Sequence, residues 1–202
     1  MSAVPNTPRF ANAQAYLAWE AWQPERHEDA GGEIYGMTGA AASHNTITFN
    51  ACASLRPLRK GIGCRTYGMG VKLHSTAKGD VLDPGLMVTC DPRDRQPGDD
   101  RGISHPWLVT EVLSDTTPAC DRGHKFQPYR SISTLTHDLL IEQTRPYAGL
   151  FFKNADAPWG LQPLQADDAI QIDRLGQPWP VASLLEDVDF TPPSAPSPPP
   201  AA

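Results

Sequence analysis

A short apolar run in the middle of the chain restricts the fold more than any other feature of the sequence. Leu86, Met87 and Val88 are apolar on successive residues, whereas a strand with one face in water alternates apolar and polar side chains. The run therefore predicts a strand that is buried on both faces. Such a strand requires a central sheet with other structure packed on each side.

The elements expected around this strand alternate between helix and strand only near the N-terminus. One helix is expected at residues 11–22 and a second between Ser43 and Leu58, with an inserted helix at 119–130 and a closing helical turn at 180–185. The strands are expected at residues 33–38, 65–73, 86–90, 107–113, 139–142, 148–152 and 169–172. This order predicts an α/β (mixed α+β) domain built on a central sheet.

The length of 202 residues suits one domain. Residues 1–10 are expected to be a flexible N-terminus, residues 11–190 the domain, and residues 191–202 a disordered proline-rich tail. No apolar run approaches the ~20 residues that cross a bilayer, so no membrane partner is expected. The net charge of −6 also argues against general electrostatic binding of nucleic acid, so any such contact would be local or metal-assisted.

The four cysteines, Cys52, Cys64, Cys90 and Cys120, form no C-x-x-C pair. A zinc site is therefore not expected. The chain also lacks a basic segment followed by an apolar core at its start, which a secretion signal would need. These features predict reduced core thiols in a cytoplasmic protein.

Glu111 is the strongest candidate for a functional residue. It lies in the middle of an expected strand, between Val109 and Leu113. A carboxylate among apolar neighbours is costly to bury unless a metal ion, a lysine or hydrogen-bond donors lie beside it. The alternative is an edge strand on which Glu111 faces water.

Other polar residues are weaker candidates when each is taken alone. Asp121 and Lys125 are four residues apart and would share one helical face, but a surface ion pair explains that spacing equally well. Glu33 follows a Gly-Gly turn and His44 lies near a helix start. A structural role accounts for either of them without catalysis.

Several short runs of the chain resemble, by their joint order over residues 11–189, the Uma-two family of restriction endonuclease relatives in the PD-(D/E)XK nuclease superfamily. The runs are Tyr16-Leu17-Ala18-Trp19-Glu20, Glu25-Arg26-His27-Glu28, Gly32-Glu33-Ile34-Tyr35-Gly36-Met37-Thr38-Gly39, Ser43-His44-Asn45, Met87-Val88-Thr89-Cys90-Asp91-Pro92-Arg93-Asp94, Glu111-Val112-Leu113-Ser114 and Asp121-Arg122-Gly123-His124-Lys125-Phe126. Each run is short, and their order carries the resemblance.

The resemblance implies a restriction-endonuclease-like central mixed sheet flanked by helices. It also implies hydrolysis of DNA phosphodiester bonds with Mg²⁺ or Mn²⁺ as the cofactor. Glu111 would then be a catalytic, metal-binding acid and Glu33 an upstream helper acid. Lys125 would orient the attacking water or stabilise the anion. A homodimer is a further expectation, because restriction-type nucleases often act as dimers.

The sequence departs from the family pattern at its acids, because glycine stands at three expected acidic positions, Gly31, Gly70 and Gly85. Gly85 replaces the Asp that would be a main metal ligand. Asp83 is the candidate replacement ligand, but it lies two residues away, about 6–7 Å along a strand, so a bulge would be needed. Two hypotheses therefore remain open. One is a weakened metal-dependent DNA endonuclease, and the other is a catalytically dead nuclease fold that acts as a binding or regulatory module.

Overall fold

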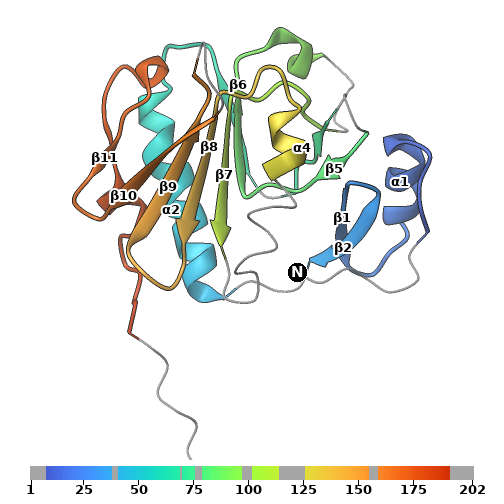
Figure 1. Ribbon diagram of the computed structural model, residues 1–202, viewed down its shortest axis with the longest axis horizontal. Coiled ribbons are helices and arrows are strands. Elements are labelled where there is room, and N and C mark those ends of the chain that lie inside the picture. The colour runs from blue at the N-terminus through green and yellow to red at the C-terminus, as the bar shows by residue number, and fades with distance from the viewer. Residues whose placement is uncertain are drawn as a thin grey trace, which may run out of the picture.

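A central six-stranded sheet, with helices on both faces, forms the body of the molecule, and a smaller sheet with its own helix lies beside it (Figure 1). The computed structural model describes residues 8–37, 41–68, 70–75, 79–96, 102–113, 126–154 and 159–191. The mixed α/β class expected from the order of elements is confirmed.

The large sheet has the strand order β10-β9-β8-β7-β6-β3. Its strands are β3 (Arg65–Gly68), β6 (Leu86–Thr89), β7 (Leu108–Leu113), β8 (His137–Glu142), β9 (Tyr147–Phe152) and β10 (Gly160–Gln165). Strands β7 and β8 run parallel, and every other neighbouring pair is antiparallel. All four residues of β6 are buried, which confirms the strand that the apolar run predicts.

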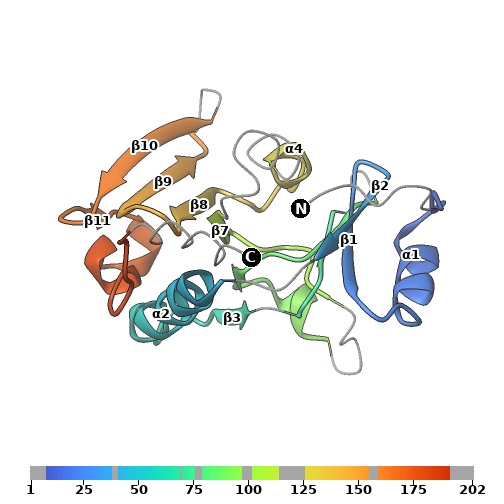
Figure 2. The same cartoon turned by 90° about the horizontal axis from the view of Figure 1, so that it is seen from below.

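The two faces of this sheet are covered differently, as Figure 2 shows with α2 (Ala42–Leu58) and α4 (Phe126–Arg130) on opposite sides. On the α2 face, Ile47 and Leu55 pack with Trp179 and with Val181 of the 3-10 helix η3 (Val181–Leu184). On the α4 face, Tyr129 packs in a second cluster with residues of the small sheet. That second cluster fixes the small sheet against the large one.

The small sheet has the order β2-β1-β5-β4. Its strands are β1 (Arg26–Ala30), β2 (Glu33–Met37), β4 (Leu73–His74) and β5 (Val81–Leu82), and α1 (Ala13–Glu20) packs beside them. Strand β1 was not expected, because the sequence pattern placed a turn at residues 29–32. The turn is confined to Gly31 and Gly32, whose φ angles of 69° and 81° suit glycine.

Other boundaries differ from the sequence-based expectation for local reasons. The strand expected at residues 65–73 is interrupted, and Gly70 in the interruption has a φ of 99°. The second helix begins at Ala42 without a side-chain cap, so Ser43 lies inside it. Strand β10 was not expected, and it contains Pro163, which an edge strand tolerates. Within the expected helix at 119–130, residues 119–125 lie outside the described part of the chain.

Smaller elements complete the described chain. They are the 3-10 helices η1 (Pro92–Arg95) and η2 (Asp173–Leu175), and the two-stranded pair of β11 (Ala169–Ile170) and β12 (Trp179–Pro180). At the N-terminal end, Phe10 packs against the rings of Tyr16 and Trp19. The proline-rich tail from residue 192 lies outside the described residues.

The expectation of reduced core thiols is wrong for three of the four cysteines. Cys64 and Cys90 form a disulfide. Cys64 precedes β3 and Cys90 follows β6, and because Arg65 pairs with Thr89, the two cysteines are cross-strand neighbours whose Cα atoms lie 4.1 Å apart. Cys52 is a free thiol on the exposed side of α2. Cys120 lies outside the described residues.

Candidate active site

Glu111 occupies the α4 face of β7, on the strand that runs parallel to β8. Its two carboxylate oxygens have different partners. The hydroxyl of Tyr129 donates a short hydrogen bond to Oε1. The backbone N–H of Gly85 donates to Oε2, with 3.4 Å between the nitrogen and the oxygen. The polar partners that a mid-strand carboxylate requires are therefore present, one from α4 and one from the segment before β6.

Tyr129 is almost completely buried, and its burial raises the pKa of the phenol well above the usual 10. The negative charge of Glu111 is the next cause, and the charges of Glu28 and Asp138 raise the pKa further. The phenol therefore stays protonated at neutral pH and acts as a donor. Three carboxylates from three different strands thus act on this one hydroxyl.

Glu28 on β1 is an acid that the sequence analysis did not single out. It is 1% exposed, and its Oε2 accepts a hydrogen bond of 3.3 Å from the backbone N–H of Asp83. The tripeptide Asp83-Pro84-Gly85 therefore lies between two carboxylates, because its first N–H donates to Glu28 and its last to Glu111. The segment thus connects β1 of the small sheet with β7 of the large sheet through hydrogen bonds.

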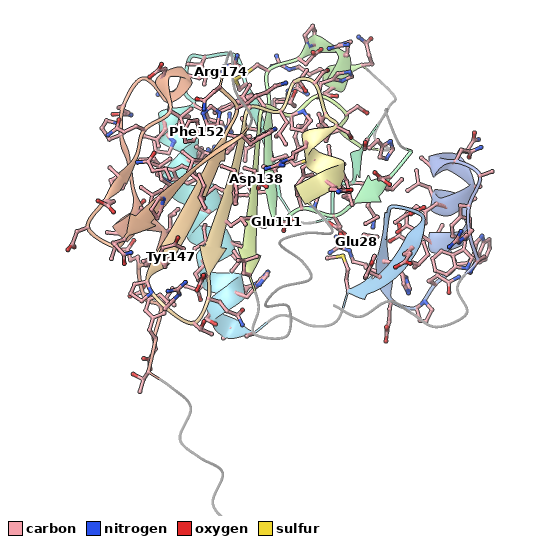
Figure 3. All side chains as sticks on the ribbon, viewed as in Figure 1. Glu28, Glu111, Asp138, Tyr147, Phe152 and Arg174 are labelled. Atoms are coloured by element: carbon pink, nitrogen blue, oxygen red, sulfur yellow. A yellow bond between two sulfur atoms is a disulfide. The ribbon has the colours of Figure 1, made fainter. Side chains whose placement is uncertain are left out.

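Asp138 lies on the strand next to Glu111. It pairs with Val109 across the parallel ladder, so its side chain is on the same sheet face as Glu111. It is 1% exposed. Figure 3 shows Glu111 and Asp138 on neighbouring strands, with Glu28 on the side of the small sheet.

Glu33 lies at the start of β2, beside the turn of the hairpin, and its side chain is exposed. It shares the hairpin face with Glu28, because Ala30 pairs with Glu33 and Glu28 pairs with Tyr35. Its Oε2 accepts a hydrogen bond of 3.0 Å from the hydroxyl of Tyr35. No contact between Glu33 and Glu111 occurs among the hydrogen bonds and ion pairs of the described residues, and the role of Glu33 stays a prediction.

Lys125 and Asp121 both lie outside the described residues. The predicted sharing of one helical face by these two side chains therefore stays a prediction. So does the approach of Lys125 to Glu111.

Asp83, the candidate replacement ligand, lies in a network of ion pairs, and its role as a metal ligand stays a prediction. Its side chain, 1% exposed, forms an ion pair with Arg26 and lies 3.4 Å from Nζ of Lys72. The same Nζ lies 2.6 Å from Oε1 of Glu20 and 2.6 Å from the backbone oxygen of His27. Two cations therefore compete with any metal ion for the oxygens of Asp83.

Of the three glycines at expected acidic positions, only Gly85 has Glu111 among its neighbours. A Cβ atom on Gly85 would lie 4.0 Å from Oε2 of Glu111 and 3.1 Å from the backbone oxygen of Thr110. A Cβ atom on Gly70 would instead face Arg26, at 3.9 Å from Nη2, and its φ of 99° disfavours a side chain. Position 85 is therefore the one of these three positions at which an added side chain would lie next to Glu111.

Comparison with known proteins identifies the family of the chain. Residues 13–181 match the model of the Uma2 family, which is described as "Putative restriction endonuclease". The chain belongs to the Uma2 family. The uncharacterized protein slr1290 of Synechocystis sp. is 33% identical over 177 residues, which cover 88% of this chain and 92% of that relative. A second Synechocystis relative, sll1609, is 32% identical over 166 residues, which cover 81% of this chain and 92% of that protein.

A solved structure shares the fold of this Uma2 chain. It is the crystal structure of a "putative nuclease belonging to DUF820" from Anabaena variabilis, which aligns with a TM-score of 0.65 at 12% identity. The alignment covers 87% of this chain and 97% of that protein. The restriction-endonuclease-like sheet expected from the motifs is thereby supported as the fold. In the described ranges, no helix combines the length and the apolar character that crossing a membrane requires.

Nucleases of this type use divalent metal ions, so the donors of this Uma2 chain can be tested for their fit. Among the residues that the structure describes, no group of three or more His, Cys, Asp or Glu side chains is arranged to hold a metal ion. Glu111 is held by Tyr129, Asp83 is paired with cations, and position 85 has no side chain. The donor set as described therefore does not fit a divalent ion.

Proposed function

We propose that this Uma2 protein is a DNA endonuclease relative whose metal site lacks one carboxylate, so that its cleavage of phosphodiester bonds is weak or absent. The observation that carries the proposal is the position of Gly85, where a Cβ atom would lie 4.0 Å from Oε2 of Glu111. A side chain at this position would be next to the strongest candidate acid. Glycine supplies none.

The chemistry of hard cations explains why one missing carboxylate matters. Mg²⁺ binds oxygens at ~2.1 Å and gives up its hydration water reluctantly, so it depends on the charge of its ligands. Two oxygens on one ion lie within ~4.2 Å of each other, and an Asp at position 85 could reach that range from Glu111. A misplacement of ~1 Å in the reacting groups can cost on the order of 10²-fold in rate.

The proposed site centres on Glu111. Glu28 is a further candidate for the upstream acid, because it is buried and accepts from the Asp83 N–H, in the same short segment whose Gly85 N–H donates to Glu111. Glu33 and Lys125 remain proposed catalytic residues on the strength of the family resemblance. Mg²⁺ or Mn²⁺ is the proposed cofactor of a completed site. DNA as the substrate, a cytoplasmic location and a homodimer belong to the same proposal.

A catalytically dead nuclease fold that binds nucleic acid or a protein is the second candidate. It is favoured by the absence, in the described part of the chain, of any group of three metal-ligating side chains. The two candidates predict different responses to metal. A weakened enzyme binds Mn²⁺ and is stabilised by it, because a ligand that binds only the folded state raises the melting temperature. A dead fold does not respond.

The test compares Mn²⁺ binding by calorimetry, and plasmid nicking, for wild type, Gly85→Asp, Gly85→Asn and Gly85→Asp with Glu111→Ala. Removing a group that hydrogen-bonds a metal ligand lowers metal affinity roughly 10–100-fold. Adding a carboxylate ligand itself, in Gly85→Asp, should therefore raise Mn²⁺ affinity at least about tenfold. Gly85→Asn is the matched control, because it adds the same bulk against the Thr110 oxygen without the charge.

Two outcomes would count against the proposal. One is robust cleavage by the wild-type protein that Glu111→Ala abolishes, since the site would then already be complete. The other is a folded Gly85→Asp variant whose Mn²⁺ affinity equals that of Gly85→Asn.

A further inference from the structure

We infer that Tyr129 is the residue that positions Glu111, holding one carboxylate oxygen so that the other is presented toward position 85. The inference rests on the proposed function, because it concerns the same acidic site. Tyr129 acts through Glu111 and is a positioning residue.

The two oxygens of Glu111 are distinguished by their surroundings. Oε1 accepts the hydrogen bond from the Tyr129 hydroxyl. Oε2 lies 3.4 Å from the backbone nitrogen of Gly85 and 4.0 Å from the place of a Cβ atom there. A glutamate side chain has several rotatable bonds, and fixing it costs conformational entropy. The Tyr129 hydroxyl offsets that cost and orients Oε2 at the same time.

Tyr129 can do this because it is itself held firmly. Tyr129 is 1% exposed and packs in one cluster with Ile132 and Leu135. The backbone N–H of Ile132 donates to the backbone oxygen of Tyr129 at 3.0 Å, which closes the turn after α4. Ser131, which lies between these two residues, donates its hydroxyl to the backbone oxygen of Pro128 at 2.6 Å. The phenol is thus carried by a tightened turn on the sheet face that holds Glu111.

A purely structural tyrosine would behave differently. Groups that hydrogen-bond a metal-binding carboxylate fix its orientation, and their removal typically lowers metal affinity 10–100-fold. Removal of a buried hydroxyl without that role changes stability only. Tyr16 provides the comparison, because it is equally buried but packs in a separate cluster with Ile34 and Val81.

The experiment measures Mn²⁺ affinity by calorimetry in the Gly85→Asp protein, alone and with either Tyr129→Phe or Tyr16→Phe. We expect Tyr129→Phe to weaken Mn²⁺ binding roughly 10–100-fold and Tyr16→Phe to leave it unchanged. Equal Mn²⁺ affinity with and without Tyr129→Phe would overturn the inference.

A second measurement separates this inference from the proposed function. If Gly85→Asp binds no Mn²⁺, the proposed function fails, and crystal structures of wild type and Tyr129→Phe decide the role of Tyr129. We expect Oε2 of Glu111 to leave the Gly85 N–H in Tyr129→Phe. A Glu111 carboxylate that keeps its wild-type position in that structure would overturn the inference.

Discussion

Replacing Lys72 by methionine should lower the free energy of unfolding by about 3 kcal/mol. The ammonium of Lys72 lies 2.6 Å from Glu20, 2.6 Å from the His27 oxygen and 3.4 Å from Asp83. The side chains of Lys72, Glu20 and Asp83 are only 11%, 12% and 1% exposed. Removal of one partner from a buried pair costs about 3–5 kcal/mol, and the lower end applies because Arg26 still neutralises Asp83.

The assay is urea denaturation at pH 7, with methionine chosen because it keeps most of the length of the lysine stem. Arg145→Gln is the control, since the Arg145 side chain of the Arg145–Glu142 pair is 59% exposed and such pairs contribute under ~1 kcal/mol. Adding Glu20→Gln to Lys72→Met should recover part of the loss by removing an unpaired carboxylate. A loss in Lys72→Met no larger than that in Arg145→Gln would refute this reasoning.

Two further predictions concern pH and the disulfide. Burial lowers the pKa of His137 to about 4, below its ordinary 6.5, so its contribution to stability is complete above pH 6.5 and is lost as the pH falls toward 4. The urea midpoint of His137→Gln should therefore decrease less over that range than that of wild type. Cys64 and Cys90 close a loop with a sequence separation of 26, so Cys64→Ser with Cys90→Ser should lower stability by about 3.5 kcal/mol without reductant. The two proteins should unfold alike after reduction, and a difference that survives reduction would point to packing instead.

The sequence predicts those strands whose residues show a clear apolar pattern. The doubly buried β6 and the hairpin of β8 and β9 were expected and are present. Strand β1 was not readable, because four of its five residues are buried yet three of those four are His27, Glu28 and Asp29. Hydrophobic periodicity cannot identify a buried strand made of polar residues. Its burial depends on partners that are distant in sequence.

The same limit explains which site residues the sequence could identify. Glu111 stands among apolar residues, so its need for polar partners was visible locally. Glu28 is separated by 55 residues from the Asp83 N–H that binds it. Glu33, only five positions along the chain, looked equivalent in sequence but lies exposed at the turn. The two acids share one face of the hairpin, and their different distances from the turn distinguish the buried acid from the exposed one.

The surroundings of Asp83 disfavour its proposed role as a replacement for the carboxylate that we propose is missing at position 85. Asp83 is two residues away, but its side chain is paired with Arg26 and Lys72. Lys72 also holds α1 and β1 in place through Glu20 and the His27 oxygen. Turning Asp83 toward Glu111 would leave two cations without that partner and would place two carboxylates side by side. Both changes are unfavourable in a partly buried site. Under the proposed function, a carboxylate would therefore be added most directly at position 85 itself, where the backbone already donates to Glu111.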